Sequence, residues 1–238
     1  MWRSLHPIQI LLPVLLFLSA SCDSRNPSRG AGQETPPPLS YLALGDSYTI
    51  GEGVDSSLRW PVQLARKLRD EGVNVADPFI IARTGWTTDE LKAGILEVAP
   101  EGPFDLVTVL IGVNNQYRGR DLEEYEVQFR SLLASAVAFA GDRRERVVVL
   151  SIPDWGVMPF AQGRDRVAIA REIDSFNQVK AEEARALGVR YVDITGISRK
   201  VAGDPSMAAG DGLHPSGAQY ALWADKTLPM VLEILGGI

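Results

Sequence analysis

Short runs of continuous apolar residues, separated by amphipathic segments, constrain the fold of this chain more than any other feature of its sequence. Residues 106–111 read Leu-Val-Thr-Val-Leu-Ile, and residues 147–150 read Val-Val-Val-Leu. Runs of this kind favour strands that are covered on both faces, as in a parallel sheet. We predict strands at residues 39–44, 73–82, 106–111, 147–152 and 189–192.

The segments between these runs have the periodicity of helices. The clearest of them carries one apolar stripe with steps of three and four, at Leu122, Tyr125, Phe129, Leu132, Leu133, Ala136, Val137 and Ala140. Further helices are predicted at residues 60–71, 88–98, 164–187 and 215–228. Alternating strands and helices predict an α/β fold, a three-layer α/β/α sandwich around a five-stranded, mostly parallel sheet.

The N-terminal segment has the pattern of an export signal. An apolar run over residues 8–18 follows a start that contains Arg3, and small residues come after it. This pattern predicts a signal peptide over residues 1–21, because the run is short for a membrane span. An uncleaved anchor is the alternative interpretation.

The sole cysteine of the chain, Cys22, directly follows this segment. Its position resembles that of the lipidated cysteine in a bacterial lipobox, although Ser19 stands where such boxes usually carry leucine. Lipid at Cys22 would provide the apolar chains that stable attachment to a membrane requires. We therefore expect export from a bacterial cytoplasm to the periplasm or cell envelope, with ordinary signal cleavage as the alternative.

Residues 22–39 have no apolar period and include Pro36, Pro37 and Pro38. A segment of this composition cannot bury enough apolar surface to order itself and is typical of a flexible tether. The organisation that we predict is therefore a signal peptide at residues 1–21, a tether at 22–39 and one domain at 40–238.

Charge and composition exclude several classes of function. The formal net charge is -6, which argues against a nucleic-acid partner, because phosphate backbones demand clustered Lys and Arg. One cysteine and two histidines cannot build a disulfide or a Cys/His metal site within one chain. The phosphate-binding and dinucleotide-binding glycine motifs are absent as well. We expect no metal and no cofactor.

Polar residues follow the predicted strands where active sites of doubly wound sheets gather. Ser47 follows the first strand, Gly85 the second and Asn114 the third. His214, just before the last helix, is the one histidine that remains after export, so it is the candidate base for a serine, and Asp211 can accept from its other ring nitrogen. Each residue alone also fits a cap or a turn.

The order and wording of these motifs resemble those of the GDSL or SGNH hydrolases, a family with a flavodoxin-like fold. The matching blocks are Gly45-Asp46-Ser47-Tyr48, Gly85, Gly112-Val113-Asn114 and Asp211-Gly212-Leu213-His214-Pro215. The resemblance implies that Ser47 attacks an acyl carbonyl, His214 removes its proton and Asp211 orients His214. It also implies an oxyanion hole made by the backbone N–H groups of Ser47 and Gly85 and the side-chain amide of Asn114.

Two departures from the family pattern are visible. Tyr48 stands where the motif has leucine, and Asn115 stands where many members have aspartate. Neither change removes a catalytic group. The GxSxG elbow of the α/β-hydrolases is absent around Ser47, because Thr49 stands at the place of its second glycine.

Other residues near these motifs have more than one interpretation. Asp154 and Trp155 lie in the loop after the fourth predicted strand and are candidates for the wall of the acyl pocket, with a surface turn and a core aromatic as the alternative. Asp46 is expected to hold the nucleophile loop by accepting backbone hydrogen bonds. Trp60 and Trp223 are expected to pack helices.

The sequence thus predicts an exported serine esterase that acts on a small-molecule or lipid acyl ester. Short-chain esters and lysophospholipids are the expected substrates. Three alternatives stay open, namely removal of acetyl groups from a carbohydrate, transfer of the acyl group to an acceptor alcohol, and a non-catalytic binding protein of the cell envelope.

Overall fold

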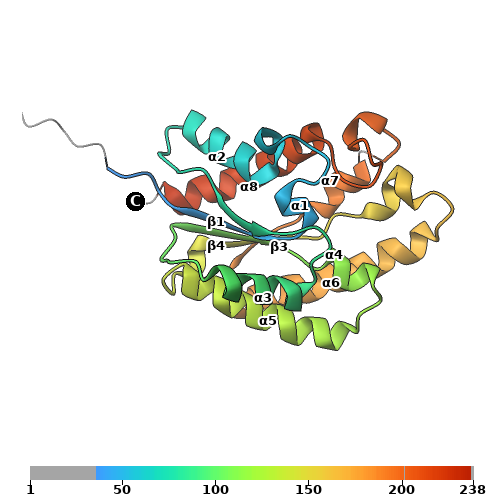
Figure 1. The fold of residues 1–238 in the computed structure, drawn as a ribbon, viewed down its shortest axis with the longest axis horizontal. Helices are drawn as coiled ribbons and strands as arrows, with labels where there is room; N and C mark the ends of the chain where they lie inside the picture. The colour runs from blue at the N-terminus through green and yellow to red at the C-terminus, as the bar shows by residue number, and fades with distance from the viewer. Residues whose placement is uncertain (1–35, 201, 237–238) are drawn as a thin grey trace, which may run out of the picture. The chain divides into compact units, whose positions relative to one another are not determined.

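The structure is a computed structural model that describes residues 36–200 and 202–236. One compact unit spans Pro37–Ile238 (Figure 1). The predicted signal peptide, the lipidation site at Cys22 and most of the predicted tether lie outside the described residues. Within those residues, no helix is long and apolar enough to cross a membrane.

A five-stranded sheet with the order β2-β1-β3-β4-β5 forms the middle of this unit, and every neighbouring pair of strands is parallel. The strands are β1 (Tyr41–Gly45), β2 (Phe79–Ala82), β3 (Leu106–Leu110), β4 (Val147–Leu150) and β5 (Arg190–Val192). All residues of β1, β3 and β4 are buried. The continuous apolar runs therefore lie in the strands that are covered on both faces, as predicted.

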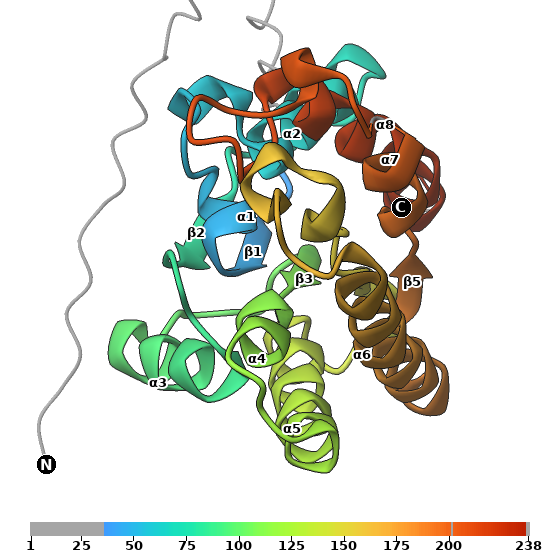
Figure 2. The same ribbon diagram turned by 90° about the vertical axis from the view of Figure 1, so that its right-hand side faces the viewer.

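Helices cover both faces of the sheet, which makes three layers (Figure 2). Helices α1, α2, α7 and α8 lie on one side, and α3, α4, α5 and α6 lie on the other. Their bounds are α1 (Ser47–Ile50), α2 (Trp60–Asp70), α3 (Thr88–Val98), α4 (Val113–Tyr117), α5 (Leu122–Phe139), α6 (Arg166–Leu187), α7 (Thr195–Lys200) and α8 (Gly217–Leu235). The predicted α/β/α sandwich with a parallel sheet is confirmed.

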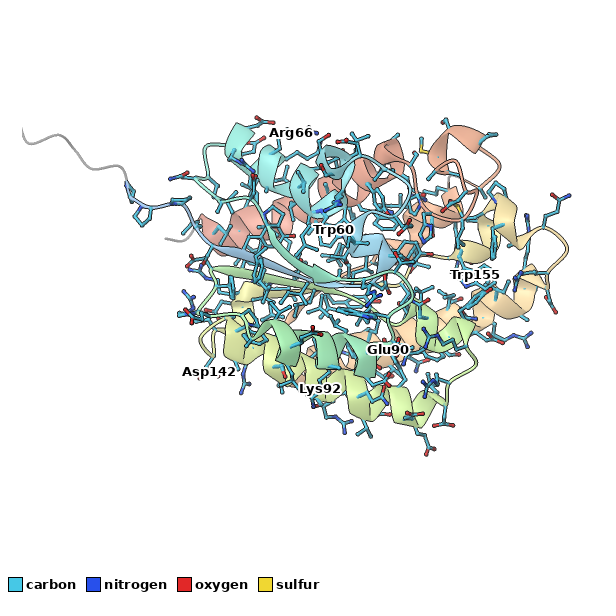
Figure 3. All side chains as sticks on the ribbon, in the orientation of Figure 1. Trp60, Arg66, Glu90, Lys92, Asp142 and Trp155 are labelled. Carbon is cyan, nitrogen blue, oxygen red and sulfur yellow. The ribbon has the colours of Figure 1, made fainter. Side chains whose placement is uncertain are left out.

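The core lies between the sheet and the two helix layers. The predicted stripe of α5 is buried there, from Tyr125 to Ala140. Trp60 and Trp223 are fully buried on α2 and α8, which pack against each other, so their predicted packing role is confirmed. Figure 3 shows Trp60 inside the layers, whereas Arg66 and Lys92 lie at the outer surfaces of α2 and α3.

Two predicted boundaries were wrong by more than two residues. The second strand begins at Phe79 instead of residue 73, since Pro78 has no N–H to give to a ladder and Val75 forms only an isolated bridge with Leu39. Helix α8 continues through Pro229 to Leu235 instead of ending at residue 228. Burial of the apolar residues beyond Pro229 offsets the loss of one helical hydrogen bond.

The short helices α1, α4 and α7 were not predicted, because segments of four to six residues are too short to show an apolar stripe. Two of them position the candidate site. Helix α1 follows β1 directly and begins at Ser47, and helix α4 follows β3 and contains Asn114. The carboxyl ends of two neighbouring strands thus bring these two residues to one edge of the sheet.

Candidate active site

A cavity of about 170 Å³ opens at this edge of the sheet. It brings together residues from the ends of β1, β2 and β3 and from the loop before α8. Its walls are formed by Ser47, Tyr48, Thr84, Gly85, Val113, Asn114, Tyr117, Trp155, Leu213 and His214. The structure therefore gathers most of the site residues predicted from the sequence, although they come from five separate stretches of the chain.

The loop that carries Ser47 is held by the residue before it. Asp46 is fully buried and caps α1, where its Oδ1 accepts a hydrogen bond of 3.0 Å from the backbone N–H of Tyr48. This confirms the predicted role of Asp46. Removal from water raises the pKa of the Asp46 carboxyl to about 7. Ser47, the first residue of α1, is 4% exposed, and it lines the cavity.

Asp211 binds His214 through both the side chain and the backbone of the histidine. The Oδ2 atom of Asp211 lies 2.6 Å from Nδ1 of His214, and its Oδ1 accepts hydrogen bonds of 2.9 Å from the backbone N–H groups of Leu213 and His214. Partial burial raises the pKa of the Asp211 carboxyl, but the hydrogen bonds from His214 and Leu213 together outweigh it and hold that pKa below its ordinary value.

The protonation of this pair follows from its geometry. Because Asp211 is ionised at neutral pH, its oxygen can only accept, so Nδ1 of His214 must donate. In a neutral imidazole the other nitrogen, Nε2, is then a proton acceptor. The neutral ring of His214, held in this way, has the tautomer that a general base requires.

Tyr48, which replaces the leucine of the GDSL motif, has a packing role in the site. Its ring is buried and meets the ring of His214 edge-on at 5.8 Å and the ring of Trp223 at 5.9 Å. Tyr48 therefore packs against the imidazole and lines the cavity beside it. Among residues 36–200 and 202–236 no hydrogen bond joins the Ser47 hydroxyl to His214, and such bonds commonly tighten only with substrate bound.

Gly85 and Asn114 lie on the cavity wall with Ser47. Gly85 has a φ of 86°, a conformation that side chains disfavour, and its carbonyl accepts a hydrogen bond of 2.6 Å from Arg118. The side-chain amide of Asn114 donates to the carbonyl of Trp86 at 2.9 Å, and within the described residues its second N–H has no acceptor. The loop after β2 and helix α4 are thereby fixed to each other.

Asn115, the second departure from the family pattern, strengthens the same connection. Its buried side chain accepts from the backbone N–H of Thr88 at 3.1 Å and donates to the Thr88 hydroxyl at 2.9 Å. An ionised aspartate could accept but not donate. Asparagine at this position thus satisfies both Thr88 groups at the start of α3.

The structure separates the two residues that were proposed for the acyl pocket. Trp155 is buried on the cavity wall, at the edge of the sheet where Figure 3 labels it, and its indole N–H donates to Gln116 at 2.8 Å. Asp154 does not line this cavity. It caps the 3-10 helix η3 (Trp155–Val157) and forms an ion pair of 2.9 Å with Arg199.

Several wall residues were not identified from the sequence. Val113 and Tyr117 flank Asn114 on α4, and Thr84 and Leu213 are neighbours of Gly85 and His214. Their positions beside the marker residues were the available signal. They are residue types that are common in cores and on surfaces, so nothing in their chemistry marked them as part of a site.

The serine and the aspartate-bound histidine share one cavity at the carboxyl edge of a doubly wound sheet. This combination is the one that serine hydrolases use to transfer an acyl group to water. Within the described residues, no group of three or more His, Cys, Asp or Glu side chains could hold a metal ion.

Comparison with known proteins identifies the family within this class. The model of the GDSL-like Lipase/Acylhydrolase family matches residues 43–222. The chain belongs to this family and is a hydrolase of carboxylic ester bonds. The family match includes all the predicted site residues except Cys22.

Individual relatives agree with this assignment. Esterase TesA of Pseudomonas aeruginosa is 25% identical over 201 residues, which cover 82% of this chain and 88% of TesA. A crystal structure of TesA has a TM-score of 0.66 at 23% identity and covers 83% of this chain and 100% of that one.

Two further solved structures share the fold. The psychrotrophic esterase EstA of Pseudoalteromonas sp. has a TM-score of 0.60 at 17% identity, over 83% of this chain and 98% of that one. The acetyl xylan esterase Axe2 of Geobacillus stearothermophilus has a TM-score of 0.60 at 23% identity, over 82% of this chain and 95% of that one.

Proposed function

We propose that this protein is a serine esterase in which Ser47 is the nucleophile, His214 the general base and Asp211 the residue that orients the base. The observation that carries the proposal is the Asp211-bound ring of His214 in the same cavity as Ser47. Nε2 of His214 takes the hydroxyl proton as Ser47 attacks the acyl carbonyl. The same proton then goes to the departing alcohol.

Oxyanion stabilisation is assigned to three donors on the cavity wall, the backbone N–H groups of Ser47 and Gly85 and the amide of Asn114. Loss of one such donor typically costs about 2.7 to 4 kcal/mol in the barrier. Water then attacks the acyl-enzyme with His214 again as base, and the acid is released. If an acceptor alcohol attacked in place of water, the protein would be an acyltransferase. The ratio of free acid to new ester among the products distinguishes hydrolysis from acyl transfer.

The cavity favours a short or narrow acyl group. It holds about 170 Å³, and Val113, Trp155 and Leu213 contribute apolar wall. Beyond Trp155 and Tyr117 lies a wider, open groove of about 470 Å³ that can receive the alcohol part of the ester. We therefore place the acyl chain in the cavity and the leaving group toward the groove.

The experiment that tests this proposal is hydrolysis of p-nitrophenyl esters from acetyl to palmitoyl by the purified unit 37–238. We expect the highest kcat/KM with acyl chains of about two to eight carbons, because a cavity of this size cannot enclose a long chain. Lysophospholipids of matched chain length serve as the second substrate set. An enzyme that hydrolyses none of these esters contradicts the proposal, and a palmitoyl optimum contradicts the placement of the acyl chain.

Removal of acetyl groups from a carbohydrate is the second candidate function. The groove beside the cavity carries polar side chains, among them Gln116, Arg164 and Glu172, next to the half-exposed ring of Tyr117. Polar groups around an aromatic ring are able to bind a sugar. Release of acetate from an acetylated xylo-oligosaccharide, faster than from p-nitrophenyl acetate, would favour this function over the first.

The lipid anchor at Cys22 and the location in the cell envelope are part of the proposal. They rest on the sequence of residues 1–22. In a bacterial host that lipidates lipoproteins, we expect the mature chain to begin at Cys22 and to carry the mass of its acyl groups. Mass spectrometry of the N-terminal peptide checks this, with Cys22→Ser as the control. A mature chain with an unmodified cysteine contradicts the anchor.

A further inference from the structure

A buried lysine binds the backbone just before helix α4, and the chemistry proposed above does not use it. Lys180 is on α6 and is fully buried, which is rare for this residue type. Its ammonium donates a hydrogen bond of 2.9 Å to the carbonyl oxygen of Ile111 and lies 5.4 Å from the ring of Phe129. A buried ammonium costs free energy unless polar groups pair with it, and the hydrogen bond to Ile111 compensates for part of that cost.

The carbonyl that Lys180 binds has a particular position in the chain. Ile111 lies just beyond the last paired residue of β3, and Gly112 after it caps α4. Gly112 has a φ of 122°, and a Cβ there would lie 2.6 Å from the hydroxyl of Tyr125. The turn from β3 into α4 is therefore tightly determined, and Asn114 follows two residues after it.

The charge of Lys180 also has a counterpart at the neighbouring strand end. Asp46, directly before Ser47, is fully buried, and its Oδ2 has no hydrogen-bond partner among the described residues. The positive charge of Lys180 favours the ionised form of Asp46, and burial lowers the pKa of Lys180 to about 7. The ammonium group thus binds the residue before Gly112 directly, and its charge acts on the residue before Ser47.

We propose that Lys180 is a positioning residue of the esterase, which fixes the turn from β3 into α4 through the Ile111 carbonyl and so holds the Asn114 amide at the oxyanion. The inference rests on the proposed function, because it needs Asn114 to act on the reaction. Lys180 does not touch the cavity, so it acts through the backbone that precedes Asn114.

The test compares Lys180→Met with Glu183→Gln on a p-nitrophenyl ester. Methionine keeps the length and apolar stem but removes the N–H donors. Glu183 is a matched control, since it is also a buried charged residue of α6 and is paired with Arg130 at 2.8 and 2.7 Å, outside the cavity. The concentration of functional sites is counted by titration with an organophosphonate, so that unfolded protein does not enter kcat.

We expect Lys180→Met to lower kcat by about 10- to 100-fold with KM changed less than about twofold, the effect of a small displacement of a catalytic group. Glu183→Gln should leave both constants within about twofold of wild type. In an Asn114→Ala background, which alone should lower kcat by about 10²- to 10³-fold, the loss from Lys180→Met should shrink to a few-fold.

Two results would overturn the inference. One is a kcat of Lys180→Met equal to that of Glu183→Gln, and the other is full additivity of Lys180→Met with Asn114→Ala. If Lys180→Met does not fold, Lys180→Gln enters the same comparison under the same criteria. Failure of the proposed function itself would give a different result, because Ser47→Ala would then retain wild-type activity.

Discussion

Replacement of Ser47 by alanine is expected to abolish ester hydrolysis, with kcat lower by about 10⁶-fold. The reason is that Ser47 is the one hydroxyl among the proposed catalytic groups, so its loss removes the acyl-enzyme route. What remains is the catalysis that the oxyanion donors and substrate binding provide on their own. Initial rates with the preferred p-nitrophenyl ester measure this loss, and the substrate should still bind.

A matched control lies on the same short helix. Thr49 also carries a buried hydroxyl on α1, but it does not line the cavity. Thr49→Ala should therefore keep kcat within about tenfold of wild type, although both variants remove one oxygen from the same turn. If Ser47→Ala and Thr49→Ala lose activity to the same extent, the loss comes from the structure of α1 and Ser47 is not the nucleophile.

The second large effect is expected at the base and its orienting carboxylate. His214→Ala should lower kcat by about 10⁶-fold, as much as Ser47→Ala, because the two groups act as a unit. Asp211→Asn should lower it by about 10⁴-fold, since an amide can donate to Nδ1 and so favour the wrong tautomer. The carboxyl of Asp211 has a pKa below its ordinary value, so it is ionised from mildly acidic pH upward. The ratio of the wild-type kcat to the kcat of Asp211→Asn should therefore be as large above neutral pH as it is at neutral pH.

Asp204 is the control for this series. It accepts from the backbone N–H two residues later, as Asp211 does, but it meets no histidine. Asp204→Asn should leave kcat and KM unchanged within about twofold. If His214→Ala keeps wild-type activity, His214 is not the general base. If Asp204→Asn and Asp211→Asn lose activity to the same extent, Asp211 only stabilises its turn and does not orient His214.

The fold was accessible from the sequence because its signals are local. Continuous apolar runs, such as those of β3 and β4, are typical of strands buried on both faces, and the stripe of α5 gave that helix correctly. Boundaries were less secure where local propensity and packing disagree. Pro229 favours the end of a helix, but α8 packs along α2 and continues past it.

Part of the candidate site could be predicted from the sequence for a different reason. Chain order in a doubly wound sheet places strand ends at one edge, so Ser47, Gly85 and Asn114 were expected together, and the short spacing of Asp211 and His214 permitted their pairing. Asp154 and Trp155 are adjacent in sequence, yet only Trp155 lines the cavity. Nothing in the sequence of that loop distinguished the two.

By itself, then, the sequence determined the layers of the fold, the strand ends that carry polar residues and the aspartate three residues before the histidine, because all of these depend on neighbours along the chain. Tertiary structure alone decided the rest. The ion pair of Asp154 with Arg199, the edge-on support of His214 by Tyr48 and the hydrogen bond from Lys180 to Ile111 join residues that are distant in sequence. Which side chain faces a strand end depends on how each helix packs on the sheet, and that packing has to fill the whole core densely and leave little apolar area exposed.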